Sequence, residues 1–150
     1  MGQTLFRKRL SILIGIIISG FCWYFSNGLT GDYWYLLWIA PIPIIYISIQ
    51  TTGRQAFFIS FISYLFGRLS WFSYLVSVAT LVPAIFITLV LSLSFALILV
   101  IARRVILKTN SWLSVFAFPV FFTAFEFLML RFSADGTAAS IAYSQSNILP

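Results

Sequence analysis

The sequence has no histidine, one cysteine and only three acidic residues among its 150 residues. The lack of histidine excludes an imidazole base and a histidine-ligated metal. A single cysteine excludes an intramolecular disulfide and a site built from several thiolates. That residue, Cys22, lies in an apolar stretch and is interpreted as a small core residue. We therefore expect neither a metal site nor a cofactor.

Charge of either sign is also scarce. Charged residues make up 8% of the sequence and hydrophobic residues 61%, and the mean hydropathy is +1.04. A soluble domain of this size needs far more polar surface, so we expect an all-α polytopic membrane helix bundle. The net charge of +6 does not indicate nucleic-acid binding, because the cations flank apolar stretches instead of sharing one solvated face.

The apolar stretches divide the chain into five membrane spans. About 20 helical residues cross the ~30 Å hydrocarbon layer. On that basis the spans are expected at residues 10–26, 33–50, 56–76, 83–102 and 112–130, within a single transmembrane domain over residues 1–150 that ends in a polar tail at 131–150.

Local signals support the boundaries of these spans. Pro83 suits the first turn of the fourth span, Arg103 and Arg104 are expected to end it, and Ser111 or Asn110 is expected to cap the fifth. Further prolines, which lack a backbone N–H, are expected to kink the second and fifth spans. They are Pro41, Pro43 and Pro119.

The cations predict the orientation. Lys and Arg in short loops are retained on the cytoplasmic side. Seven of the nine cations occupy alternate loops, namely Arg7, Lys8, Arg9, Arg54, Arg103, Arg104 and Lys108. We therefore expect a cytoplasmic N-terminus and, after five crossings, a C-terminal tail outside.

Aromatic and small residues have ordinary explanations. Aromatic side chains near the span ends are expected to anchor the membrane interface, namely Trp23, Tyr24, Tyr33, Trp34, Tyr35 and Trp112. Small residues are expected at helix contacts, namely Gly15, Ser19, Ser92, Ser94 and Ala96.

Two ionisable residues lie inside the spans. Arg68 is about 18 Å along the third span and Glu126 about 21 Å along the fifth, and both spans run outward. An isolated charge in hydrocarbon costs several kcal/mol, so they are expected to pair or to share a hydrated cavity that opens outward. The alternative is that Arg68 snorkels to the headgroups while Glu126 is protonated or faces lipid.

Several motifs together resemble the N-terminal membrane region of apolipoprotein N-acyltransferase. They are residues 38–43, residues 67–71, Arg103 with Arg104, Pro119, Glu126 with Arg131, and residues 142–145. The most specific part is the combination of Pro119, the Glu-Phe-Leu-x-x-Arg stretch and the downstream Tyr-Ser-Gln. One departure is the tail at residues 136–140, which lacks the aromatic residue that many family members carry there.

The resemblance implies an acyltransferase of lipoprotein maturation in the bacterial cytoplasmic membrane. Its donor is a phospholipid and its acceptor the N-terminal amine of a diacylglyceryl-cysteine lipoprotein. Catalysis by Cys, Glu and Lys belongs to a nitrilase-like domain that this chain does not contain, so the chain is expected to be an inactive fragment by itself, or the partner of a separately encoded domain. No catalytic residue is expected here. The candidates for lipid or substrate contact are Arg68, Trp71, Glu126, Arg131, Tyr143 and Gln145.

Two other classes of function remain open. Arg68, Glu126 and the prolines would suit a small transporter or channel subunit, although a pore normally has more polar residues than these spans provide. A non-catalytic membrane scaffold is the other alternative.

Overall fold

The computed structural model describes residues 2–26, 33–109 and 111–132, and every regular element in these ranges is a helix. The elements are α1 (Gly2–Ser26), α2 (Leu36–Ile39), α3 (Pro41–Ile49), α4 (Gly53–Ala79), α5 (Leu81–Lys108), the 3₁₀ helix η1 (Trp112–Phe116) and α6 (Ala117–Phe132).

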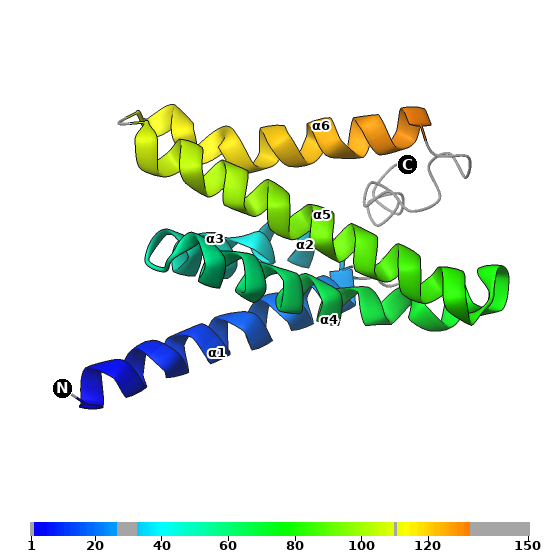
Figure 1. The fold of residues 1–150 in the computed structure, drawn as a ribbon, viewed down its shortest axis with the longest axis horizontal. Helices are drawn as coiled ribbons and strands as arrows, with labels where there is room; N and C mark the ends of the chain where they lie inside the picture. The colour runs from blue at the N-terminus through cyan, green and yellow to red at the C-terminus, as the bar shows by residue number, and fades with distance from the viewer. Residues whose placement is uncertain (1, 27–32, 110, 133–150) are drawn as a thin grey trace.

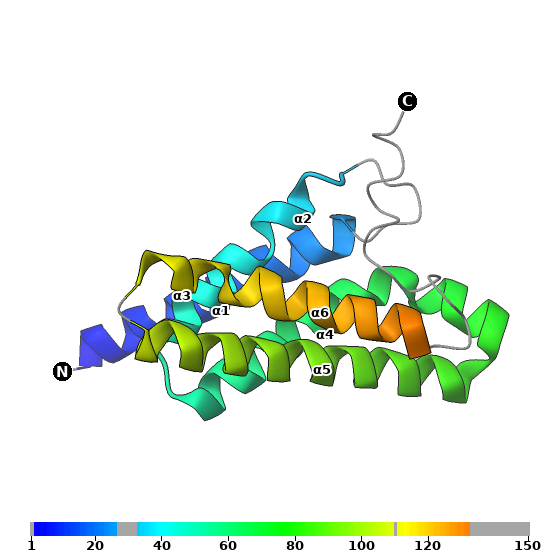
Figure 2. The same cartoon turned by 90° about the horizontal axis from the view of Figure 1, so that it is seen from above.

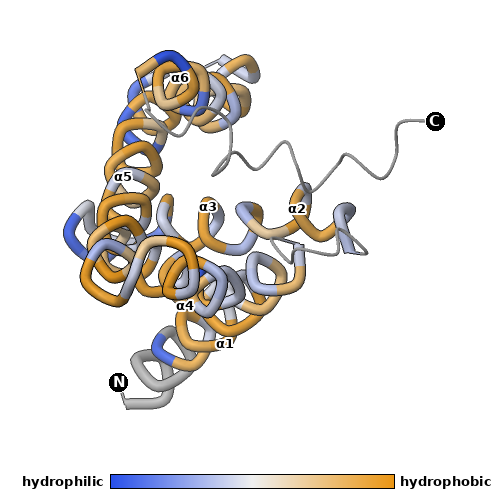
Figure 3. The backbone as a smooth tube through the Cα atoms, turned by 90° about the vertical axis from the view of Figure 1, so that its right-hand side faces the viewer, coloured by the Kyte–Doolittle hydropathy of each residue, from blue (hydrophilic) through white to orange (hydrophobic). Residues whose placement is uncertain are grey.

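Four helical segments of the described chain are long and apolar enough to cross a membrane: Arg9–Ser26, Gly53–Ala79, Leu81–Lys108 and Trp112–Phe132. Figure 3 shows that apolar residues dominate along these helices. The expected all-α membrane helix bundle is confirmed.

The second expected span, residues 33–50, is shorter than the sequence indicates. Its apolar helical part runs over Leu36–Ile49 and is divided at Ala40. Pro41 and Pro43 have no N–H, so the carbonyls four residues before them lose their usual helical donors and the helix breaks. At 1.5 Å per residue these 14 residues cover about 21 Å, less than the hydrocarbon layer.

One boundary prediction is wrong. Helix α5 continues through Arg103 and Arg104 to Lys108, because arginine ends an apolar stretch without ending a helix. The fifth span changes from the 3₁₀ helix η1 to α6 close to Pro119, which is the third residue of α6, while a kink at Pro119 itself stays a prediction. The expected cap is confirmed, since the Ser111 hydroxyl accepts a hydrogen bond from the N–H of Leu113.

Successive segments alternate in direction, so that the N-terminus, the α3–α4 turn and the end of α5 lie at one end of the bundle (Figure 1). Arg103 joins two of these parts. Its Nε donates to the Ser48 carbonyl at 2.6 Å, and its Nη2 donates to the Thr51 carbonyl. The alternation matches the cation pattern, while the side of the membrane that each end faces stays a prediction.

Helix α4 is the centre of the packing, with α1 on one side and α5 on the other, while α6 lies along α5 (Figures 1 and 2). Small residues allow the close approach of α1: Ser63 donates to the Ile16 carbonyl at 3.5 Å, and the buried Ser19 donates to the Ala40 carbonyl at 2.6 Å. Gly15, Ser19, Ser92 and Ala96 are buried and Ser94 is half-buried, as expected for contact residues.

Candidate functional site: a buried arginine beside an aromatic core

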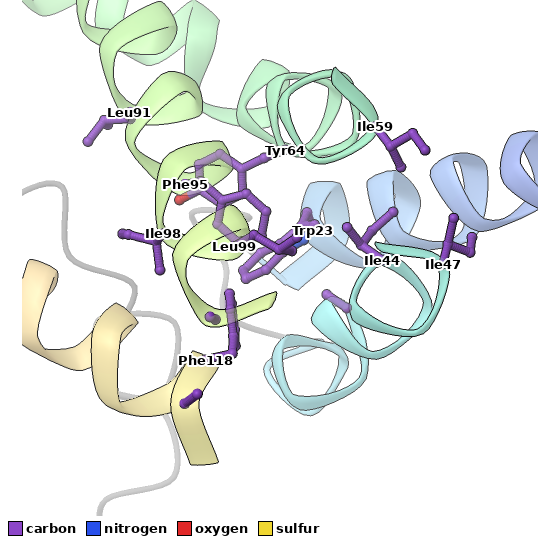
Figure 4. Close-up of a cluster of buried hydrophobic side chains, with 13 residues drawn as sticks. Trp23, Ile44, Ile47, Ile59, Tyr64, Leu91, Phe95, Ile98, Leu99 and Phe118 are labelled. Carbon is purple, nitrogen blue, oxygen red and sulfur yellow. The ribbon is translucent and has the colours of Figure 1, made fainter. Parts of the chain in front are cut away.

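An aromatic cluster from α1, α4 and α5 forms the base of the candidate site (Figure 4). The ring of Trp23 meets Tyr64 edge to face at 5.0 Å and Phe95 at 5.4 Å, and Tyr64 stacks on Phe95 at 4.3 Å between centroids. Trp23 is only 2% exposed, so its expected role as an interface anchor is wrong. It is accommodated in the core because Gly67 of α4 has no side chain where the two helices meet.

Arg68 lies one helical turn after Tyr64 and is 2% exposed. Its guanidinium carbon lies 5.5 Å from the ring centroid of Trp71, which is a cation–π contact. Its charge also acts on the hydroxyl of Tyr64, one turn earlier on the same helix. The alternative in which Arg68 snorkels to the headgroups is therefore wrong, because its charge is enclosed by the bundle.

Glu126 of α6 is half-buried, and its charge acts on the Tyr64 hydroxyl, as does that of Arg68. A cation on α4 and an anion on α6 therefore both act on the hydroxyl of Tyr64. This placement agrees with the expectation that Arg68 and Glu126 lie at similar depth. Direct pairing of the two charged groups stays a prediction.

Three buried nitrogen atoms lack a hydrogen-bond partner among the described residues: Nε and Nη2 of Arg68 and Nε1 of Trp23. A buried donor without an acceptor carries the full cost of its desolvation, about 1–3 kcal/mol and more for a charged group. Polar atoms left in this way mark a place where an acceptor from outside the described chain would bind favourably.

The other candidates are distributed differently. Trp71 is half-buried beside Arg68, while Arg131 is exposed in the last turn of α6, five residues after Glu126. Tyr143 and Gln145 lie outside the described residues. Cys22 is half-buried within α1, and no group of three potential metal ligands occurs in the part of the chain that the structure describes.

An open apolar groove of about 320 Å³ lies between α4 and α5. Its walls are formed by residues without charged side chains, namely Ile62, Leu65, Phe66, Leu69 and Phe72 of α4 and Ile85, Thr88 and Leu89 of α5. Such a surface suits hydrocarbon, whether from a lipid or from a neighbouring helix.

Two residues of the cluster were missed by sequence reasoning. Tyr64 carried a usable signal, because a residue four positions before Arg68 lies on the same helical face. Trp23 carried no such signal, since an aromatic residue near a span end is equally compatible with a position in the interfacial aromatic belt or in the core.

The comparisons with known proteins give one match. The model of the apolipoprotein N-acyltransferase N-terminal domain family covers residues 19–150, a range that contains Trp23, Tyr64, Arg68 and Glu126. No curated protein and no solved structure matches the chain. The match takes in all the described helices except the first part of α1, and the chain belongs to the apolipoprotein N-acyltransferase N-terminal domain family.

Proposed function

We propose that this chain is the membrane portion of an enzyme that moves an acyl chain from a phospholipid to the N-terminal amine of a diacylglyceryl-cysteine lipoprotein. The observation that carries the proposal is the family match over residues 19–150. A bundle with four helices long enough to span a membrane agrees with a substrate and a product that are both membrane-bound. The proposed location is the bacterial cytoplasmic membrane.

The acyl-transfer chemistry is assigned to a nitrilase-like domain working with this bundle. There a cysteine thiolate takes the acyl group as a thioester, a glutamate acts as base and a lysine stabilises the oxyanion. Cys22 is not proposed as that nucleophile, because it lies among the apolar residues of α1. The role proposed for the bundle is to hold lipid near its outer end, through Arg68, Trp71, Glu126, Arg131, Tyr143 and Gln145.

Reconstitution tests this division of labour. The chain is placed in phospholipid vesicles alone, or fused after Pro150 to the nitrilase-like domain of an apolipoprotein N-acyltransferase, and the domain is also assayed alone. Acylation of a diacylglyceryl-cysteine peptide is followed by its mass increase. We expect acylation only when bundle and domain are joined. Equal acylation by the domain without the bundle would contradict the proposal.

A further inference from the structure

The two partnerless nitrogens of Arg68 form one edge of its guanidinium group. Nε and Nη2 are adjacent, and their N–H bonds on this edge point the same way, which is the geometry that meets two oxygen atoms of a phosphate or carboxylate. The guanidinium group lies against the ring of Trp71, 5.5 Å from its centroid. Arg68 is therefore held beside Trp71, while its two-donor edge is enclosed and has no acceptor among the described residues.

An anion fits this edge better than a neutral partner. The guanidinium stays charged at any relevant pH, and a charge enclosed in a membrane protein is stabilised by a counter-charge. Arg68 is 2% exposed, and its Nε and Nη2 have no acceptor among the described residues. An anion with two oxygen atoms would satisfy both donors and the charge.

Ser70, Ser73 and Ser77 lie between Arg68 and the C-terminal end of α4, and Ser73 and Ser77 are exposed. Arg68 is eleven residues from Ala79, about 16 Å along the helix.

Helix α6 is the element that a ligand would displace. Both partnerless nitrogens of Arg68 are enclosed, so an oxyanion reaches them only if a neighbour moves. In α6 the buried residues are Ala117 and Phe118, both in its first turn, whereas Glu126 lies in the half without buried residues. The outer half of α6 is thus held by less packing than α4 or α5.

We propose that the Nε/Nη2 edge of Arg68 binds the phosphate group of a membrane lipid, which enters as the outer half of α6 moves away from α5. Only the source of the phosphate, a lipid, rests on the proposed function. The oxyanion site itself rests on the burial and the free donor edge of Arg68.

Binding measured without any acyl transfer tests this inference. The full chain is purified in a maltoside detergent that contains no phosphate, and retained lipid is counted by native mass spectrometry with phosphatidylglycerol or with diacylglycerol of the same chains. We expect the phospholipid to bind at least about ten-fold more tightly, because charge-assisted hydrogen bonds to the phosphate are present only there. Equal affinity for the two lipids overturns the proposal, with no variant needed.

Matched arginine variants assign the site. Arg68→Lys keeps the charge but loses the two-donor edge, and it should weaken phospholipid binding by about ten-fold. Arg104→Lys, on an exposed residue of α5, should leave binding unchanged. Equal losses in both variants overturn the assignment to Arg68. Competition by millimolar inorganic phosphate would support the oxyanion site, because both oxyanions would use the same two donors.

Failure of this inference is distinguishable from failure of the proposed function. Acyl transfer by the bundle joined to a nitrilase-like domain, together with equal binding of phospholipid and diacylglycerol, would leave the proposed function intact and remove the Arg68 site. Phosphate-dependent binding without acyl transfer would leave the Arg68 site intact and remove the proposed function.

Discussion

Gly67 of α4 lies against Trp23 of α1 so closely that a methyl group at Gly67 would be 2.2 Å from the Cβ of Trp23 and 3.2 Å from its carbonyl carbon. Neither atom is the end of a flexible side chain. The backbones of α1 and α4 therefore approach as closely here as a glycine permits, and this contact places Trp23 beside Tyr64 and next to the turn that carries Arg68.

Gly67→Ala should therefore separate α1 from α4 and destabilise the bundle by about 1–3 kcal/mol through overpacking. The measurement is the thermal unfolding midpoint of the purified chain in detergent. The matched control is Gly53→Ala, where the nearest atom, Nη1 of Arg103, would lie at an ordinary 3.9 Å. If both variants unfold at the wild-type temperature, the close contact is not present in the protein.

Ser19→Ala should cost about 1 kcal/mol, because it removes a buried hydrogen bond between α1 and the carbonyl of Ala40, at the break between α2 and α3. Ser92 is the matched control: it is equally buried, but its hydroxyl donates to the Thr88 carbonyl of its own helix at 2.8 Å. In Ser92→Ala that carbonyl keeps its helical donor, so a smaller loss is expected in the same unfolding measurement. A larger loss in Ser92→Ala than in Ser19→Ala would contradict this account.

The positions of the long helices follow from composition, but their irregularities do not. Four of the expected spans overlap long helices, because apolar length decides which segments enter a membrane. The pairs are residues 10–26 with α1, 56–76 with α4, 83–102 with α5, and 112–130 with η1 and α6. The break at Ala40 was only partly foreseeable, since Pro41 and Pro43 predict a disturbed helix but not whether it kinks or divides.

The candidate site shows the same limit. Arg68 and Glu126 were identified because a charge within an apolar span is costly and therefore uncommon. The burial of Trp23 depends on Gly67, 44 positions later in the sequence, and no local pattern encodes that contact. The action of both charges on Tyr64 requires α6 to pack where it does, which only tertiary structure determines.

Arg103→Ala should loosen the α3–α4 turn, because it removes two charge-assisted hydrogen bonds to the Ser48 and Thr51 carbonyls near the end of α3. Such bonds are worth about 1.5–3 kcal/mol each when desolvated, and the half-buried position of Arg103 favours the lower figure. Hydrogen exchange is the local readout: amides of residues 50–52 should exchange faster while those in the middle of α5 stay protected. Arg104→Ala, at an exposed neighbour, is the control.

The cation pattern predicts which end of the bundle faces the cytoplasm, and the single cysteine makes this measurable. In a Cys22→Ala background, Thr80→Cys at the α4–α5 turn should react in intact cells with a membrane-impermeant thiol reagent. Lys108→Cys at the opposite end of α5 should react only after the membrane is opened. Reaction of both positions from the same side would show that α5 does not cross.

Thr80 joins α4 to α5 with φ 68° and ψ 173°, and it is the only non-glycine residue with positive φ among those described. Its side chain makes no capping hydrogen bond to α5, so the threonine gains nothing there that would offset the strained backbone. Thr80→Gly should therefore stabilise the bundle by about 1 kcal/mol, less the extra entropy of glycine in the unfolded chain.

The matched control for Thr80→Gly is Thr109→Gly at the other end of α5. Thr109 has φ −104° and ψ 113°, an ordinary extended conformation, so glycine there can only add flexibility and should leave stability unchanged or slightly lower. The two variants thus differ in sign in one thermal unfolding experiment. Equal destabilisation by both would mean that the α4–α5 turn carries no strain, and that its conformation differs from the one described.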